Sequence, residues 1–289
     1  MTMTLQIPQH TSPIIPWAPR AIQKGVPLKN VLGAEVIVYI ARNISLFYQA
    51  FDSQGFCALA VKGIEPLTLT QRGQHIAEAL WHYLPKPYSQ SVGIIMASLT
   101  EIKTQANEFG LAEMFYMPHC QLVATYGLSA EYNDGEDPFD LSMQAQYELT
   151  RRFTAEFSMR PFLQAYPHRT LAVLEDWLQD DNPHVRRLCC EATRPRLPWA
   201  KQLKGFIADP QPLLTIFAAL KDDESLYVRR SVANNMGDIC KDHPQLIYDL
   251  CESWLTDASK ERKWVIRHAL RHPAKKAEPR ALEIRLAAK

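Results

Sequence analysis

The segment Asp181-Asn-Pro-His-Val185-Arg186-Arg187 occurs a second time, with changes, as Asp223-Glu-Ser-Leu-Tyr-Val228-Arg229-Arg230. A weaker copy is Lys260-Glu-Arg-Lys-Trp-Val265-Ile-Arg267-His268. The first two Val residues are 43 positions apart and the next two are 37 apart. An earlier Arg-Arg pair, at 151 and 152, precedes the pair at 186 and 187 by 35 residues. The second half of the chain is therefore an internal repeat.

A period of about 40 residues is typical of stacked helix pairs of the HEAT-like class. The apolar residues outside the repeat also recur at helical spacing. Amphipathic runs are found from Leu28 onward, at 71–84, 90–103, 109–127, 140–158, 169–179, 184–194, 212–221, 224–241, 244–257 and 260–271. No segment alternates as a strand would. We predict an all-α superhelical solenoid of HEAT-like repeats with a concave, basic binding groove.

The two ends of the chain differ from this pattern. Residues 1–27 contain Pro8, Pro13, Pro16, Pro19 and Pro27, which predicts an irregular N-terminal arm. Residues 28–272 form the expected repeat domain, and residues 273–289 are predicted to be a basic tail.

The charge is distributed unevenly along the 289 residues, although the formal net charge is only +1. Residues 1–145 contain 8 basic and 12 acidic residues, whereas residues 146–289 contain 24 and 19. Fifteen of the 24 are Arg, the side chain suited to bidentate phosphate contacts. A polyanion is therefore a candidate partner of the second half.

Several functional classes lack their motifs. With only 11 Gly residues, and neither GxGxxG nor GxxxxGK[ST], a nucleotide-binding enzyme is not indicated. The six Cys residues show no CxxC spacing, which predicts reduced thiols, no metal site and a cytoplasmic location. No signal peptide and no apolar run of about 18 residues is present, so we expect no membrane association.

Three carboxylates lie close to the apolar stripes of the repeat helices: Glu156, Glu191 and Asp238. Glu156 and Glu191 are 35 residues apart, which is close to one repeat, so they can occupy equivalent places on adjacent repeats. Asp238 should lie about one turn further along its own helix. Surface ion pairs are the alternative, because Arg187 and Arg194 have i,i+4 and i,i+3 spacing to Glu191.

The first Arg of each Val-Arg-Arg copy has two possible roles. It can bind an acidic residue of a neighbouring repeat, or it can face the partner. The second Arg, Arg187 or Arg230, lies about 100° further round the helix and is the better candidate for a phosphate contact.

The run Arg194-Pro195-Arg196-Leu197-Pro198-Trp199 is the most unusual stretch. Its two prolines end a helix and fix a turn. Cations beside an aromatic ring suit a nucleic acid, but Trp199 can also be a buried anchor. Trp17, Trp81, Trp177, Trp254 and Trp264 lack such neighbours and are predicted to be packed in the core or against the arm.

The run from Asn182 to Trp199 resembles the signature of the AlkC branch of bacterial DNA alkylation repair proteins. The similarity extends through Phe139–Phe157 and Tyr227–Pro244, and it covers about residues 25–272. Those proteins are HEAT-like-repeat DNA glycosylases related to AlkD. The resemblance implies hydrolysis of the N-glycosidic bond of cationic alkylated bases in duplex DNA, chiefly N3-methyladenine, with N3-methylcytosine as a second candidate.

The resemblance places the acids of the family's active site on Glu156, Glu191 and Asp238, and its nearby aromatic residue on Trp199. We assign Asp238 to water activation and sugar stabilisation, with Glu156 and Glu191 recognising the cationic nucleotide; these roles are interchangeable at this level. No metal or other cofactor is implied. The residues expected to contact the DNA backbone are Arg152, Arg160, Arg187, Arg194, Arg196, Arg230, Lys241 and Arg267.

Two other functions remain open on the sequence. One is a HEAT-repeat module that binds DNA without catalysis, and the other is a protein-interaction scaffold. Release of a base from methylated DNA separates the glycosylase from both. A monomer is expected, because a solenoid can take a duplex on its concave face without a second copy.

Overall fold

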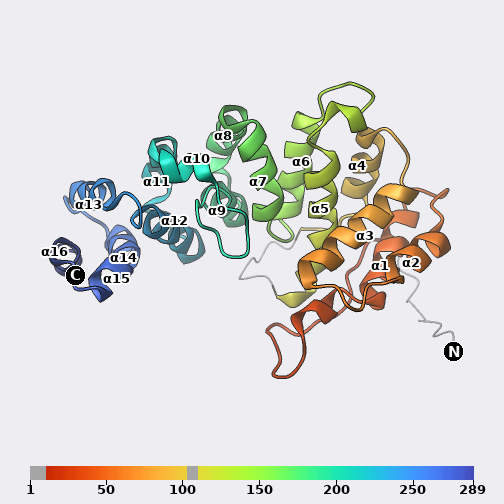
Figure 1. The fold of residues 1–289 in the computed structure, drawn as a ribbon, viewed down its shortest axis with the longest axis horizontal. Helices are drawn as coiled ribbons and strands as arrows, with labels where there is room; N and C mark the ends of the chain where they lie inside the picture. The colour runs from red at the N-terminus through yellow and green to blue at the C-terminus, as the bar shows by residue number, and fades with distance from the viewer. Residues whose placement is uncertain (1–10, 103–109) are drawn as a thin grey trace. The chain divides into compact units, whose positions relative to one another are not determined.

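The computed structural model describes residues 11–102 and 110–289, and all regular elements among them are helices (Figure 1). This confirms the all-helical class. The chain divides into two compact units, Met1–Ser158 and Met159–Lys289. The domain expected over residues 28–272 extends over parts of both units, which are described separately.

The first unit contains η1 (Leu28–Val31), α1 (Ala34–Ser45), α2 (Ser53–Val61), α3 (Leu69–Tyr83), α4 (Tyr88–Ala97), η2 (Leu111–Tyr116), α5 (Met117–Tyr126), η3 (Ala130–Tyr132) and α6 (Phe139–Thr150). In its core α3 packs against α5, and α1 packs against α2. The Thr68 hydroxyl and the Gln71 side chain cap the start of α3 reciprocally, which fixes where this helix begins. The expected helices over 90–103 and 109–127 each extend into residues outside the described ranges.

The N-terminal arm is irregular, as expected, over its described residues 11–27. The Asn43 side chain of α1 holds it by two hydrogen bonds: it accepts from the Ile14 amide at 3.1 Å and donates to the Ile14 carbonyl at 2.8 Å. Part of the arm is thus fixed on the first unit.

Helix α7 (Glu156–Ala165) crosses the boundary between the units. The second unit then contains α8 (Pro167–Asp176), η4 (Trp177–Gln179), α9 (Pro183–Glu191), α10 (Lys204–Ala208), η5 (Gln211–Leu213), α11 (Leu214–Leu220), α12 (Leu226–Ile239), α13 (Pro244–Ser253), α14 (Lys260–Ala269), α15 (Arg271–Lys275) and α16 (Pro279–Ala287). The single helix expected over 140–158 is wrong, because α6 ends at Thr150 and α7 begins only at Glu156.

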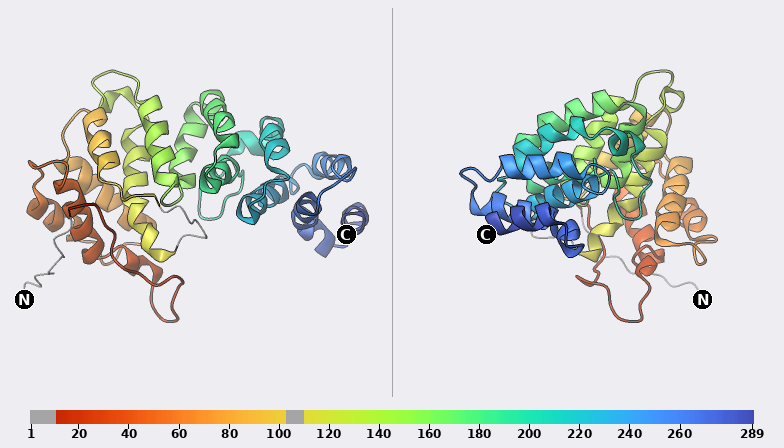
Figure 2. Two further views of the ribbon diagram at one scale, coloured as in Figure 1. Left: turned by 180° about the vertical axis from the view of Figure 1, so that it is seen from behind. Right: turned by 60° about the vertical axis from the view of Figure 1, so that its left-hand side comes forward.

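The internal repeat corresponds to α9, α12 and α14. Helix α12 packs against both of the others, and Figure 2 shows this row from two further sides. Val185, Val228 and Val265, which align in the three copies, are all fully buried. Burial of a branched apolar side chain contributes about 1.5–3 kcal/mol, so the recurring Val marks the core of each repeat.

The first Arg of each of the two strong copies has a structural role. Arg186 Nη1 donates to the carbonyls of Asp180 and Asp181 at 2.8 and 3.1 Å, and Arg229 Nη1 donates in the same way to Asp223 and Glu224 at 2.5 and 2.9 Å. Arg186 also forms a bidentate pair with Asp223 of the next repeat, at 2.7 and 3.0 Å. The structural alternative is therefore confirmed for Arg186.

The segment expected to be a basic tail is folded. Helices α15 and α16 lie within residues 271–287, and α16 packs against α13 and α14. Arg280 of α16 binds Asp249 at 2.5 Å and Glu252 at 2.6 Å. The tail was predicted from its charge, but Ala281 and Ile284 are buried and give α16 an apolar face.

Candidate active site

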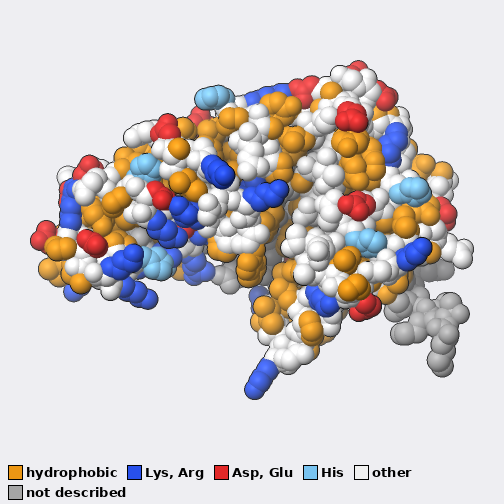
Figure 3. Space-filling model, in the orientation of Figure 1, with side chains coloured by type: hydrophobic (Ala, Val, Ile, Leu, Met, Phe, Trp, Pro, Cys, Tyr) orange, Lys and Arg blue, Asp and Glu red, His pale blue; other side chains and the backbone are white. Residues whose placement is uncertain are grey.

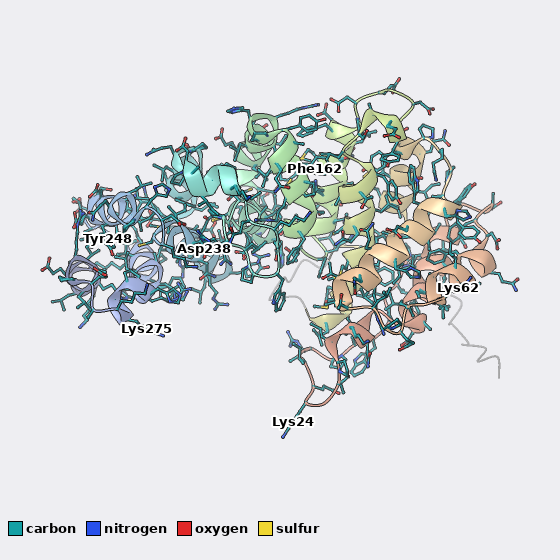
Figure 4. All side chains as sticks on the ribbon, in the orientation of Figure 1. Lys24, Lys62, Phe162, Asp238, Tyr248 and Lys275 are labelled. Atoms are coloured by element: carbon teal, nitrogen blue, oxygen red, sulfur yellow. The ribbon has the colours of Figure 1, made fainter. Side chains whose placement is uncertain are left out.

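Two of the three predicted acids meet at one guanidinium group in the second unit. Glu191 is the last residue of α9, and Asp238 is the last but one of α12. Arg194 Nη1 donates to Glu191 Oε1 at 2.7 Å, and its Nε donates to Asp238 Oδ2 at 2.9 Å. Because α9 and α12 pack side by side, the turn after α9 carries Arg194 to the end of α12. Asp238 is labelled in Figure 4.

Each carboxylate has further partners. Ser231 Oγ donates to Glu191 Oε2 at 2.7 Å, and Arg187 lies 3.4 Å from Glu191 Oε1. Lys241 Nζ donates to Asp238 Oδ1 at 3.1 Å. Both carboxylates are about 7% exposed. They are held in fixed positions, and each can act only as a hydrogen-bond acceptor or as a negative charge while it is ionised.

Opposing effects determine the pKa of Glu191. Burial raises this pKa, but Arg187, Arg194 and the Ser231 hydroxyl together outweigh burial, so the pKa lies below its ordinary value. A lowered carboxyl pKa means that ionisation stabilises the folded state above the ordinary pKa, and this stabilisation is lost as the pH falls through the folded value.

We therefore expect Glu191→Gln to lower the free energy of unfolding by about 2 kcal/mol at pH 7, because a charge-assisted hydrogen bond is lost. The difference from the wild type should shrink as the pH falls below the ordinary pKa of a glutamate and through the lower pKa of Glu191 in the folded protein. Urea unfolding of both proteins at several pH values measures this difference in the free energy of unfolding. A difference that stays constant over this range would contradict the assigned ionisation.

The turn after α9 is held from inside by Arg160 of α7. The Arg160 side chain is buried, and its guanidinium donates to the carbonyls of Ala192, Arg194 and Lys201 at 2.5–3.1 Å. Arg160 therefore supports the backbone of residues 192–201. Its predicted contact with DNA is wrong, because the donors are directed at carbonyls within the protein.

Trp199 is presented by this turn. Its side chain is 92% exposed, and its φ of 64° lies in the left-handed region that non-glycine residues rarely adopt. The alternative of a buried anchor is therefore wrong. An exposed Trp in a constrained conformation is a common feature of binding sites, since a solvent-facing indole gains free energy only when a ligand covers it.

Glu156 lies in a different local setting. It is the first residue of α7, it is 7% exposed, and it accepts a hydrogen bond from the Thr154 hydroxyl. Glu191, in contrast, ends its helix. The two acids do not occupy equivalent places in their helices, and the 35-residue spacing was misleading because residues 151–155 interrupt the expected helix.

Comparisons with known proteins identify the family of the chain. The model of the DNA alkylation repair enzyme family matches residues 153–273. The uncharacterised protein YhaZ of Bacillus subtilis (strain 168) is 33% identical over 258 residues, which cover 89% of this chain and 67% of YhaZ. The chain belongs to the DNA alkylation repair enzyme family.

A solved structure of this family is also similar. The alkylpurine DNA glycosylase AlkC of Pseudomonas fluorescens, bound to DNA containing an abasic site analogue, is 37% identical with a TM-score of 0.79. The match covers 90% of this chain and 68% of AlkC. The helical repeat fold is therefore of the AlkC type, and the residues that carry the predicted site, from Glu156 to Asp238, fall inside the segment that the family model matches.

The cations predicted to contact DNA make different contacts within the protein. Arg152 is tied to Thr100 and Glu148, Arg196 forms a bidentate pair with Asp242, and Arg267 donates to the Ala288 carbonyl. These contacts give Arg152 and Arg267 structural roles that the charge pattern could not reveal.

Two other cations, Arg230 and Lys241, are exposed and better placed for a phosphate. Arg187 is less exposed: it pairs with Glu191, and its guanidinium lies 5.0 Å from the centre of the Tyr227 ring. His268, whose ring stacks on Trp264, lies close to the same group of cations. Burial lowers the pKa of His268 most, and the nearby Arg271 and Arg230 lower it further, to about 4. Figure 3 shows Lys and Arg side chains on the surface of the second unit.

Sequence reasoning missed two residues of the site. Ser231, one turn after Val228, binds Glu191 directly. Arg271 Nη2 donates to Asn234 Oδ1 at 2.9 Å, and burial and Arg194 lower its pKa while Asp238 opposes this shift. Helical spacing was a usable signal for Ser231, whereas Arg271 comes from another helix and left no pattern in the sequence.

Neither a metal cluster nor a membrane span is found in the described ranges, 11–102 and 110–289. No group of three or more His, Cys, Asp or Glu side chains there can hold a metal ion. No helix in these ranges is both long and apolar enough to cross a bilayer.

Proposed function

We propose that this protein is a monofunctional DNA glycosylase that excises alkylated purine bases from duplex DNA. The observation that carries the proposal is the group formed by Glu191, Asp238 and Arg194, next to the exposed Trp199, in a chain 37% identical to an alkylpurine DNA glycosylase. A protein that only binds DNA does not need two buried carboxylates fixed at one point of its surface.

The chemistry follows from the substrate. Alkylation at N3 of adenine leaves a cationic base, which departs without needing a strong acid. The sugar then develops positive charge at C1′, and a carboxylate nearby stabilises that charge and orients the attacking water. Asp238 is our candidate for both tasks, since Arg194 and Lys241 fix its two oxygens.

Glu191 and Glu156 are proposed to recognise the cationic nucleotide by electrostatic attraction. Glu191 is suited to this because its lowered pKa keeps it ionised at neutral pH. Trp199 is proposed to contact the lesion or its sugar with its exposed ring. N3-methyladenine is the proposed principal substrate, and N3-methylcytosine is the second candidate.

The partner is duplex DNA, bound without reading its sequence. Arg187, Arg230 and Lys241 are the proposed phosphate contacts, because such contacts position a protein on DNA without specifying a base. The chemistry requires no Schiff base, so the product is an intact abasic strand. We propose that the protein acts as a monomer.

The test is abasic-site formation in a methylated duplex. We expect alkali-labile sites to accumulate with time, no strand nicks before the alkali treatment, and no protein–DNA adduct after borohydride is added. Nicks without alkali, or a borohydride-trapped adduct, would contradict the monofunctional mechanism. Absence of abasic sites, from folded protein that binds the same duplex, would leave a DNA-binding module.

A further inference from the structure

The arm carries an exposed apolar loop, residues 16–27, which we call the arm loop. Trp17 is 82% exposed, Ile22 is 64% exposed and Val26 is 49% exposed. The prediction that Trp17 is packed in the core or against the arm is therefore wrong. Large apolar side chains grouped in this way on a surface usually mark a contact with a partner.

Two backbone hydrogen bonds support the arm loop. The Pro19 carbonyl accepts from the Leu111 amide at 3.3 Å, and the Gln23 carbonyl accepts from the Val26 amide at 3.2 Å. Gly25, with φ of 82°, makes the turn that only glycine adopts without strain. The apolar side chains are therefore displayed by a supported loop.

The charges of the loop indicate the kind of partner. The first 34 residues contain no Asp or Glu, although residues 1–145 as a whole have a net charge of −4. Arg20 and Lys24 are exposed and form no side-chain hydrogen bond or ion pair with the residues that the structure describes. Lys24 stands at the tip of the loop in Figure 4, and Figure 3 shows hydrophobic side chains along the same loop.

We propose that the arm loop is a second DNA contact, separate from the carboxylate site. Arg20 and Lys24 bind backbone phosphates, while Trp17 and Ile22 pack against the sugar edges of the minor groove. Proteins that distort DNA combine cations with apolar wedges in this way. An apolar protein partner does not account for the absence of acidic residues. The inference depends on the proposed function only for the identity of the partner, DNA.

The first test uses the double variant Arg20→Ala/Lys24→Ala with an undamaged, fluorescently labelled duplex. Each phosphate contact contributes about 0.9 to the slope of log affinity against log salt. We expect the slope to fall by about 1.8 and the affinity at 50 mM salt to fall by about tenfold. Lys62→Ala is the matched control, because Lys62 is also an exposed lysine of the first unit, at the end of α2 (Figure 4).

The second test uses Trp17→Ala. Loss of an apolar contact should weaken DNA binding severalfold and leave the salt slope unchanged. If both variants bind DNA with the wild-type affinity and the wild-type salt slope, the proposal is wrong. It is also wrong if sedimentation shows a self-association that Trp17→Ala abolishes while DNA binding stays intact. Neither test requires base release, so a failed glycosylase assay and a failed arm-loop assay are distinguishable.

Discussion

Asp238→Asn should reduce base excision from methylated duplex DNA by at least about a hundredfold, which is the effect of removing one preorganised electrostatic group from a transition state. Asn keeps the size of the side chain and can still accept from Arg194, but it supplies no negative charge to the developing cation at the sugar. Single-turnover excision under saturating enzyme measures the effect on chemistry alone.

The control separates catalysis from binding. Asp238→Asn should bind undamaged duplex as tightly as the wild type, or more tightly, because a negative charge has been removed beside a polyanion. Asp242→Asn is the matched variant, since Asp242 is an exposed acid four residues further along that pairs with Arg196. It should keep nearly full activity. A fully active Asp238→Asn enzyme would remove Asp238 from the catalytic site.

Arg160→Met should destabilise the protein by about 3 kcal/mol, because the carbonyls of Ala192, Arg194 and Lys201 lose their donor. The same turn carries Arg194 and Trp199, so excision should also fall in the fraction that remains folded. Chemical denaturation gives the first effect, and single-turnover excision well below the denaturation midpoint gives the second.

Arg196→Met is the matched control for this variant. Arg196 lies on the same turn, but its guanidinium binds Asp242 in a pair that solvent screens, so its loss should change the stability far less than the loss of Arg160. Equal losses of stability in Arg160→Met and Arg196→Met would show that the three carbonyl contacts of Arg160 do not support the turn.

The repeat could be predicted from the sequence because its core is periodic. Val185, Val228 and Val265 are buried for the same reason in each copy. Before two of them, backbone carbonyls of acidic residues accept from the Arg that follows the Val. The pairing of Glu191 with Arg194 was visible as i,i+3 spacing. Local spacing therefore predicted the helices and half of the site.

The rest depended on contacts between distant residues. Arg194 forms a hydrogen bond with Asp238, which is 44 positions later in the sequence, and Arg160 forms one with Lys201, which is 41 positions later. No local sequence pattern indicates either contact. The exposure of Trp199 follows from the turn that Arg160 supports, so the sequence alone left the buried anchor open as an alternative. The helix at the end of the chain was not predicted, because the apolar face of α16 is short and the many charged residues around it suggested a solvated tail.

The most direct test of the central claim is release of free base from duplex DNA treated with a methylating agent, without added metal, with the products separated by chromatography. We predict that N3-methyladenine is released by the wild type and not by Asp238→Asn. If the folded wild-type protein binds this DNA and releases no alkylated base, the glycosylase assignment is contradicted.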